Sequence, residues 1–359
     1  MNGRQSQHFF LGGNTADGFY PLNERLTHMP QNSFFWVIKG GAGCGKSSFM
    51  RLIASAAEGA GFAVEYFACS GDPDSLDGIF IEELKTGYMD GTAPHIADVH
   101  LAAVDSSYLD IGRFYDLEGI EKHSSQLLKL NERIHEEYKK VYALLAAAGA
   151  LKRGWLGALT DKDEAALAEK RLDGILRREL GTRLRRGGVI SRRFLSAITW
   201  KGEYSFADTA KALCKRVYLF DSRLGLGALL LEKTAIAARD SGFKVIAAAD
   251  PLTPEKLEAV FIPTLELGFS LTNSALTAGI PSRRIYLDAK GEGSARKEKK
   301  GELARCDKLV TTLKAEAIDA LGQTKRLHDL IERIYNPFVD FEGMHKLVAE
   351  HLKQLAINS

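Results

Sequence analysis

The sequence is poor in cysteine and has no long apolar run. Its four cysteines are widely spaced and form no CxxC pattern, so neither a zinc site nor a disulfide framework is expected. The longest apolar run, residues 141–151, is too short to span a bilayer, and the first ten residues lack the apolar core of a secretion signal. These absences predict a cytoplasmic protein that does not insert into membranes.

A surplus of charge of one sign is also missing. Lysine and arginine number 48, and aspartate and glutamate 46, so the formal net charge is +2 and nucleic-acid binding is not demanded. Positive charge is concentrated only in residues 151–193, which hold 12 basic and 6 acidic side chains. This basic segment is consistent with a lid over a phosphate site, with a surface for an unknown macromolecular partner, or with a solvated helix face.

The chain of 359 residues is long enough for two or three domains, and it contains an internal repeat. Residues 10–20 (FLGGNTADGFY) match residues 194–204 (FLSAITWKGEY) at an offset of 184. Two further pairs follow in the same order at an offset of 181, namely GFAV (61–64) with GFKV (242–245) and LDGIFIEEL (76–84) with LEAVFIPTL (257–265). Three collinear matches predict a duplicated fold, whose parts we call the first and the second copy.

Each copy has the same predicted order of strand, helix and strand. In the first copy, short apolar runs predict strands at 34–39 and 62–68 on either side of a helix at 46–58, where apolar residues recur at helical spacing. The corresponding elements of the second copy are predicted at 216–221, 228–239 and 243–249. The fold class is therefore α/β, with two tandem parallel-sheet domains, each followed by a helical segment.

The predicted domain boundaries follow from these elements. We expect the first copy at 1–116, a helical and basic connecting segment at 117–190, the second copy at 191–290, and a charged loop with C-terminal helices at 291–359. The helix-rich parts are expected to pack on their own sheets. Residues 289–302 (AKGEGSARKEKKGE) lack apolar periodicity and predict a flexible charged loop.

Residues 40–47 (GGAGCGKS) fit the pattern GxxxxGK[ST] and lie between a predicted strand and a predicted helix. In such a P-loop the glycines let backbone N–H groups face inward, and the helix N-terminus attracts phosphate. Lys46 is expected to reach the β- and γ-phosphates of a nucleotide, and the Ser47 hydroxyl to bind Mg²⁺. The predicted nucleotide-binding residues here are Gly40, Gly41, Ala42, Gly43, Cys44, Gly45, Lys46, Ser47 and Ser48.

Two acidic segments offer a further ligand for Mg²⁺. Asp72 and Asp74 follow the second predicted strand, where an aspartate pair holds the metal through water or acts as base for an acceptor hydroxyl. Asp90 ends another short apolar run and is the alternative, and each of these aspartates is also consistent with a turn or N-cap residue. His95 is a candidate contact for the γ-phosphate, or a loop histidine. The candidate catalytic residues are thus Lys46, Asp72, Asp74 and Asp90, and the candidate metal ligands are Ser47, Asp72 and Asp90.

The second copy lacks the residues that a triphosphate requires. Ala228 stands where the first copy has Lys46, and Leu229 stands where it has Ser47. Without an ammonium group and a hydroxyl, this loop cannot offset the desolvation of a triphosphate or hold its metal. We therefore expect no Mg-nucleotide in the second copy.

The whole chain resembles a family of bacterial tandem P-loop ATPases whose biological role is unassigned. The resemblance rests on six segments in the order of the family: HFFLGGNTADGFY (8–20), KGGAGCGKSS (39–48), CSGDPDSLDGI (69–79), MDGTAPH (89–95), FLSAIT (194–199) and RLHDLIERIYNPFVDFE (326–342). It implies ATP binding by the first copy and makes Asp72, Asp74, Asp77, Asp90 and His95 positions of family motifs. It implies no substrate.

The expected function is ATP binding, with ATP hydrolysis in the first copy and an inactive second copy as a regulatory or structural partner. The sequence has no NKxD or TKxD for a guanine base and no LSGGQ signature, which favours ATP with Mg²⁺ over GTP and argues against a transporter cassette. Two alternatives stay open. One is a phosphotransferase that uses an aspartate base, and the other is a non-enzymatic module that binds ATP.

Overall fold

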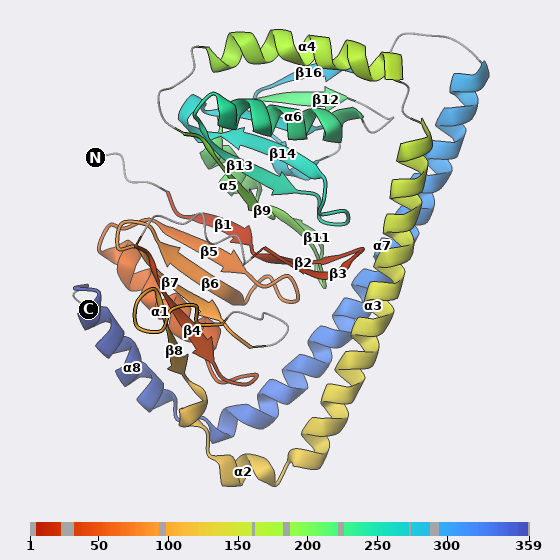
Figure 1. Cartoon of the computed structure of the whole chain (residues 1–359). Helices are drawn as coiled ribbons and strands as arrows, with labels where there is room; N and C mark the ends of the chain where they lie inside the picture. The colour runs from red at the N-terminus through yellow and green to blue at the C-terminus, as the bar shows by residue number, and fades with distance from the viewer. Residues whose placement is uncertain are drawn as a thin grey trace.

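The computed structural model describes residues 5–22, 32–92, 98–159, 162–181, 187–221, 226–272, 274–287 and 294–357. Within these ranges the chain forms an α/β fold with two six-stranded, mostly parallel sheets, each followed by helices (Figure 1). None of the helices in these ranges is both long and apolar enough to cross a membrane.

The first copy is a sheet with the strand order β1-β5-β6-β7-β4-β8. A short hairpin, β2–β3, extends from it, and one helix, α1, connects β4 to β5. The bounds are β1 Gln7–Phe10, β2 Gly12–Thr15, β3 Gly18–Pro21, β4 Phe34–Lys39, α1 Lys46–Gly59, β5 Val64–Ala68, β6 Leu76–Ile81, β7 Thr86–Asp90 and β8 Ser106–Asp110.

The second copy repeats this plan with the strand order β9-β13-β14-β15-β12-β16. Its hairpin is β10–β11, and α6 connects β12 to β13. The bounds are β9 Val189–Arg193, β10 Ser196–Thr199, β11 Gly202–Ser205, α5 Ala207–Leu213, β12 Arg216–Asp221, α6 Leu226–Asp240, β13 Lys244–Ala249, β14 Leu257–Ile262, β15 Leu267–Leu271 and β16 Ser282–Tyr286. The matching strand orders confirm the duplication that the sequence repeat predicted.

One strand of each sheet runs against the others. β6 pairs antiparallel with β5 and β7, and β14 pairs antiparallel with β13 and β15. The predicted parallel sheets are therefore confirmed in the main, but each contains one antiparallel strand that was not predicted. Both strands are buried along their whole length and are apolar apart from Asp77 and Glu258, and such sequences do not reveal the strand direction.

Helices cover the outer face of each sheet. α1 buries the residues that predicted it, Phe49, Met50, Ile53, Ala54 and Ala57, and α8 (Phe341–Gln354) packs beside it. On the second copy, α6 and α4 (Lys162–Leu180) form the outer layer. The inner faces of the two sheets meet in one apolar cluster that includes Phe67, Phe80 and Phe261. α4 is the main described helix of the basic segment, so this part of the segment lies on the second copy.

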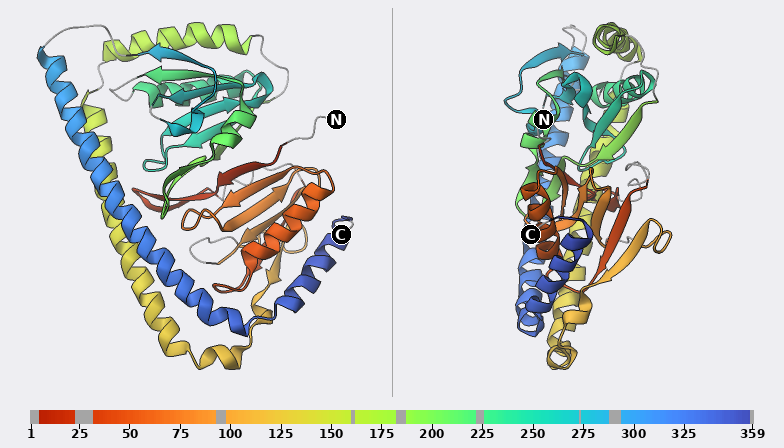
Figure 2. Two further views of the ribbon diagram at one scale, coloured as in Figure 1. Left: turned by 180° about the vertical axis from the view of Figure 1, so that it is seen from behind. Right: turned by 90° about the vertical axis from the view of Figure 1, so that its left-hand side faces the viewer.

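The two longest helices pack on each other. α3 (Ser124–Leu159) and α7 (Ser294–Tyr335) share a cluster with Val141 and Leu145 on one side and Ala317 and Leu321 on the other. Figures 1 and 2 show the pair running along both copies in opposite directions. The expected packing of each helical part on its own sheet was therefore wrong, because the apolar stripes of α3 and α7 face one another. We call this pair the brace.

The flexible loop expected at 289–302 is largely a helix. α7 begins at Ser294, while residues 288–293 lie outside the described ranges. Lysine, arginine and glutamate have high helix propensities, and no proline interrupts the segment from 294 to 302. A charged stretch without apolar periodicity can therefore form part of a long helix.

Two short segments that resemble each other, one after β8 and one after α7, close the end of the brace next to the first copy. We call this end the foot of the brace. Tyr115 and Val339 form an antiparallel bridge between the two segments. Each segment then starts a helix with an aspartate N-cap, Asp116 for α2 (Leu117–Glu121) and Asp340 for α8. The foot thus joins the end of the first sheet to the helix that covers it.

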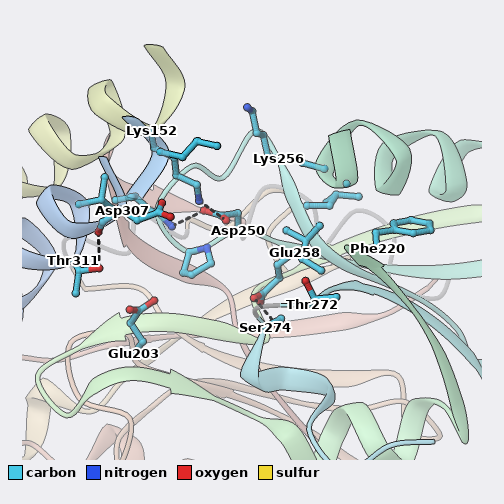
Figure 3. A pocket seen from close by; sticks show the side chains of 18 of the residues that line it. Lys152, Glu203, Phe220, Asp250, Lys256, Glu258, Thr272, Ser274, Asp307 and Thr311 are labelled. Atoms are coloured by element: carbon cyan, nitrogen blue, oxygen red, sulfur yellow. Dashed lines mark hydrogen bonds and ion pairs between the residues drawn. The ribbon is translucent and has the colours of Figure 1, made fainter. Parts of the chain in front are cut away.

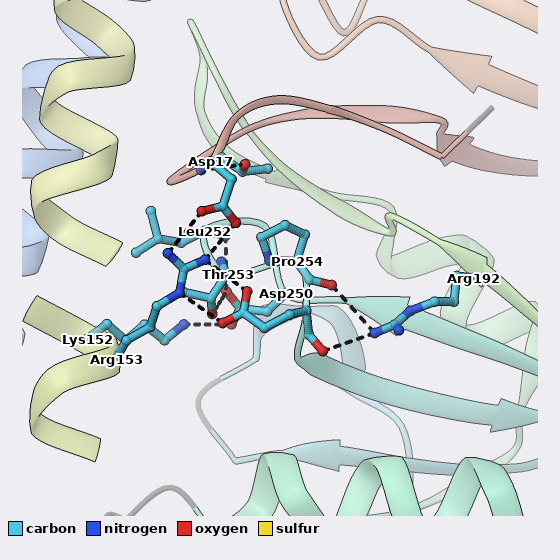
Figure 4. Close-up of polar contacts among 10 residues, drawn as sticks. Asp17, Lys152, Arg153, Arg192, Asp250, Leu252, Thr253 and Pro254 are labelled. Atoms are coloured by element: carbon cyan, nitrogen blue, oxygen red, sulfur yellow. Dashed lines mark hydrogen bonds and ion pairs between the residues drawn. The ribbon is translucent and has the colours of Figure 1, made fainter. Parts of the chain in front are cut away.

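Each copy also extends its hairpin to the other copy. In the turn of β2–β3, Ala16 N donates to Leu252 O (2.9 Å), and Asp17 accepts two hydrogen bonds from Arg153, which also binds Glu255 (Figure 4). Near this contact, Lys152 pairs with Asp250 at 2.7 Å. The hairpin of the first copy is therefore anchored to the loop that follows β13.

The second hairpin makes the reciprocal contact. Trp200, in the turn of β10–β11, donates to Asp72 Oδ1 (3.3 Å), and Lys201 pairs with Asp74. Where the hairpins begin, Phe10 and Phe194 form an antiparallel bridge with each other. The two copies thus exchange equivalent hairpins across an approximate two-fold relation.

Candidate functional site

The glycine-rich segment 40–47 forms the turn between β4 and α1. Gly43 and Gly45 have φ values of 70° and 89°. Residues with a side chain rarely adopt this left-handed backbone conformation, so the turn requires glycine at both positions. The loop leads directly into the first residue of α1, which is Lys46.

The N-terminus of α1 is free to attract an anion. Gly45 provides no side-chain cap, and the first turn of α1 contains no acidic residue. The first N–H groups of this helix therefore lack an intrahelical partner, and the positive end of the helix dipole is not neutralised there. A phosphate group fits such a position.

Lys46 and Asp90 lie side by side next to this helix end. Lys46 Nζ donates to the carbonyls of Gly40 and Gly41, at 2.8 Å each, and lies 3.6 Å from Asp90 Oδ2. β7 pairs in parallel with β4, with Asp90 opposite Ile38, which brings the carboxylate to the loop. The site therefore combines one ammonium group and one carboxylate, both mostly buried.

Two further aspartates, Asp72 and Asp74, follow β5 and have different partners from Asp90. Asp72 accepts hydrogen bonds from Trp200 and from Ser75 (3.1 Å) and pairs with Lys325 at 3.2 Å. Burial alone would raise the pKa of Asp72, but the bonds from Trp200 and Lys325 outweigh burial and lower it. The side chain of Asp74 is 68% exposed and pairs with Lys201. Both aspartates therefore hold the hairpin of the second copy.

A cavity of about 600 Å³, the first cavity, lies between the loop and the brace. Its lining includes the glycine-rich loop with the start of α1, the segment 69–77, Asp90 and Thr92 at the end of β7, the β2–β3 hairpin, and the facing sides of α3 and α7. The lining residues from the brace include Tyr138, Tyr142, Thr324, Lys325, His328 and Glu332. Volumes of this size are typical of pockets for small molecules.

The contribution of α7 was not predicted as part of the site. Burial raises the pKa of Glu332 and lowers the pKa of His328, and both side chains share the first cavity with Lys46. Lys325, His328 and Glu332 recur at helical spacing, so they lie on one face of α7. That periodic polar face was the available signal, and two of its residues, His328 and Glu332, lie within the 326–342 segment.

The foot of the brace contacts the outer side of the loop. Tyr115 donates from its hydroxyl to Ala42 O (3.0 Å), and a Cβ added to Gly45 would lie 2.5 Å from Met344 Sδ. The amide of Asn336, oriented to satisfy its neighbours, donates to Gly43 O at 3.2 Å. The loop is thus held between the sheet and the C-terminal helices.

The remaining predicted residues fall into three groups. Ser47 accepts a hydrogen bond from Leu76 N (3.0 Å) and, like Ser48 and Asp77, lines the first cavity. Cys44 is buried and donates to Gly41 O (3.1 Å), so it fills space inside the turn. His95 lies outside the described residues, as do residues 222–225, which align with the first residues of the glycine-rich loop.

The corresponding helix start of the second copy carries Ala228 within α6.

No family model, no curated protein and no solved structure matches the chain. We therefore interpret the site from its geometry and from the differences between the two copies.

Proposed function

We propose that the first copy binds ATP with Mg²⁺ at the glycine-rich loop and hydrolyses it, and that the second copy acts as a structural or regulatory partner without a nucleotide of its own. The observation that carries this proposal is the position of Lys46. It stands at an uncapped helix start, beside Asp90 and at the edge of a cavity of about 600 Å³. This is the arrangement that P-loop nucleotide hydrolases use.

Phosphate binding would use groups that the loop already presents. The ammonium group of Lys46 is held by the carbonyls of Gly40 and Gly41. A β- or γ-phosphate offers stronger, charge-assisted hydrogen bonds than these neutral carbonyls, so Lys46 would turn toward it. The N–H groups at the start of α1 would bind the same phosphates from the other side.

The oxygen atoms beside the loop fit Mg²⁺. This ion usually keeps several water molecules and binds through one or two protein oxygens plus phosphates. Ser47 and Asp90 supply such oxygens directly beside Lys46, although Asp90 also accepts from Thr92 and Ser47 from Leu76 N. Asp72 lies in the segment after β5, where Lys325, Trp200 and Ser75 hold it. We therefore assign Ser47 and Asp90, rather than Asp72, as the ligands. Bound Mg²⁺ would neutralise charge on the phosphates.

The state of the other aspartates favours hydrolysis over phosphate transfer. A base for an acceptor hydroxyl needs a carboxylate within hydrogen-bond reach of that hydroxyl. Asp72 and Asp74 are both engaged with the hairpin of the second copy. The transfer alternative thus requires one of these contacts to open.

Calorimetric titration with Mg-ATP tests the binding step. Replacing Lys46 removes the charge that binds the β- and γ-phosphates, so we expect Lys46→Ala to weaken ATP binding roughly a hundredfold. Lys211→Ala, on the exposed surface of α5, is the matched control and should bind like the wild type. A folded Lys46→Ala protein with unchanged affinity would refute the assignment of the loop.

Product analysis then separates the three candidate functions. Phosphate release from ATP without any acceptor supports hydrolysis. Transfer of phosphate to an added hydroxyl compound supports the phosphotransferase. A rise in melting temperature with Mg-ATP but no turnover supports the binding module.

A further inference from the structure

The second copy has its own cavity at the position that corresponds to the first cavity. It has a volume of about 760 Å³ and lies between the ends of β12 and β15, the start of α6 and the brace (Figure 3). Apolar side chains form part of its wall, namely Phe220, Leu257, Leu271, Leu303 and Val310. We call it the second cavity. Its size suits a small organic ligand.

The two cavities differ in charge at matched positions. Pairing the equivalent strands and helices aligns five positions, which carry two lysines and two aspartates in the first copy but three carboxyl groups and no lysine in the second. The pairs are Lys39 and Asp221, Lys46 and Ala228, Cys69 and Asp250, Asp77 and Glu258, and Asp90 and Leu271. Only Lys46 of the two lysines lines the first cavity, and the second cavity contains Lys152, Lys256, Arg284 and Lys314. The change that bears on phosphate is therefore the loss of Lys46 at the helix start.

Two of the three carboxyl groups have partners. Asp250 pairs with Lys152 at 2.7 Å, and Asp221 lies 3.6 Å from Arg284. Glu258 is different, because it is only 7% exposed and its Oε1 accepts no hydrogen bond of normal geometry from the described part of the chain; the nearby Ser196 hydroxyl, which is bonded to Ser205, only partly offsets the effect of burial on its pKa. Its other oxygen accepts a long hydrogen bond from Ser274 (3.5 Å). Figure 3 shows Glu258 between Asp250 and Ser274 in the wall of the cavity.

A buried carboxyl oxygen without a donor is costly, and native proteins rarely retain one unless a ligand or water satisfies it. When Glu258 is ionised, the missing partner must supply an N–H or O–H donor. The lining of the second cavity has five carboxyl groups and four cations, so one further cation would balance the ionised form. No group of three metal-binding side chains occurs among the described residues, so an organic cation fits better than a metal ion.

We propose that the second cavity binds a small organic molecule that carries a protonated amino group, with Glu258 as its counter-ion. The ammonium group would donate to Oε1 of Glu258 and to the hydroxyl of Ser274. The apolar wall that includes Phe220, Leu271 and Val310 would hold the carbon skeleton. This activity is independent of ATP binding by the first copy.

A matched pair of probes tests the charge requirement. Octane-1,8-diamine and octane-1,8-diol have the same length, but only the diamine is charged at pH 8, because alkyl amines titrate near lysine. We expect calorimetry to detect the diamine and not the diol. Equal binding of the two compounds, or binding of neither, would overturn the proposal.

Glu258→Gln tests the assigned residue. It keeps the size of the side chain but removes its charge, and we expect it to weaken binding of octane-1,8-diamine by about tenfold or more. Glu169→Gln, on α4 at the surface of the second copy, is the matched control and should bind the diamine like the wild type. If Glu258→Gln folds and binds the diamine as well as the wild type, Glu258 is not the counter-ion.

The pH dependence of the wild type gives a readout that needs no variant. Burial and the nearby Asp250 carboxylate raise the pKa of Glu258 to about 8. The amine must therefore displace a proton from Glu258, and its affinity should rise about tenfold or more between pH 6 and pH 8. The other charged side chains of the cavity come from each surrounding element: Lys152, Glu203, Asp221, Asp250, Lys256, Arg284, Asp307 and Lys314. A flat profile would contradict the role of Glu258.

Discussion

The two cavities occupy the same place in the same fold, yet they differ in the side chains around the helix start. The first cavity contains Lys46 beside an uncapped helix start, whereas the second has Ala228 at that point and the buried carboxyl group of Glu258 nearby. Both are closed by the same two helices of the brace. The comparison teaches that a duplicated scaffold can keep a cavity at the same place while the side chains at a few of its positions change.

The strongest expected contrast is the effect of pH on stability. The pKa of Glu258 in the folded protein is about 8, above the ordinary value of 4.5, so the folded state keeps a proton that the unfolded state has released. The stability from Glu258 is therefore fully present below about pH 4.5 and falls by about 1.4 kcal/mol per pH unit up to about pH 8. Denaturant unfolding of the wild type should show this decline. Glu258→Gln should remove about 4 kcal/mol of it between about pH 5 and pH 8. Equal slopes in the two proteins would contradict the neutral state of Glu258.

The next contrast concerns the acidic residue of the first cavity. Asp90→Asn removes a charge that we assign to Mg²⁺, so ATP hydrolysis should fall roughly a hundredfold while ATP binding changes little. Steady-state phosphate release measures this effect. Asp110→Asn is the matched control. Asp110 ends β8, on the other side of β4 from β7, and lies outside the lining of the first cavity, so this variant should retain full activity. Full activity of Asp90→Asn would leave Asp90 a structural residue.

A smaller effect separates two lysines of α7. Lys325 pairs with the mostly buried Asp72, whereas Lys314 pairs with Glu203, whose side chain is 50% exposed. Lys325→Ala leaves a buried carboxylate with one partner fewer and should destabilise the protein by about 1–2 kcal/mol. Lys314→Ala should cost less than about 1 kcal/mol because water replaces the lost partner. Urea unfolding of both variants compares them directly, and equal losses would show that burial of the carboxylate is not the deciding factor.

The smallest expected effects concern two glycines near the first copy. A Cβ added to Gly343 would lie 2.4 Å from the Asp340 carboxylate and 2.8 Å from the Phe114 ring, whereas one added to Gly322 in α7 meets nothing closer than 3.9 Å. Gly343→Ala should therefore lower stability by about 1 kcal/mol through overpacking at the foot of the brace. Gly322→Ala should raise stability by about 0.5–1 kcal/mol because alanine favours a helix. Thermal melting gives the sign of each change, and a shift of the same sign in both would argue against close packing at the foot.

Local patterns predicted the parts of the fold that depend on neighbouring residues. The strand before the glycine-rich loop, the helix after it and the duplication all follow from sequence periods and matches, and the strands at 34–39 and 216–221 have the predicted bounds. The direction of β6 and β14 could not be predicted, because a strand buried on both faces has no alternation. The brace could not be predicted either, since helical periodicity shows an apolar stripe but not its partner.

The candidate site was predictable to the same degree. The glycine-rich loop, Ser47 and Asp90 all lie at or just after the carboxyl ends of the adjacent strands β4 and β7, so spacing along the sequence was enough to propose them. Lys325 and Glu332 come from a helix far along the chain, and only the fold brings them to the first cavity. The roles of Asp72 and Asp74 depend on Trp200 and Lys201, so no local pattern could reveal that they anchor a hairpin.

The brace also has a consequence for synthesis on the ribosome. α3 ends at Leu159, but its partner α7 is complete only at Tyr335. At about 5–20 residues per second, the apolar stripe of α3 waits for on the order of 10–30 s before α7 can cover it. During that interval the nascent chain exposes Val141 and Leu145, which are fully buried in the finished protein. The first copy therefore cannot complete its packing against the brace until the C-terminal helices emerge.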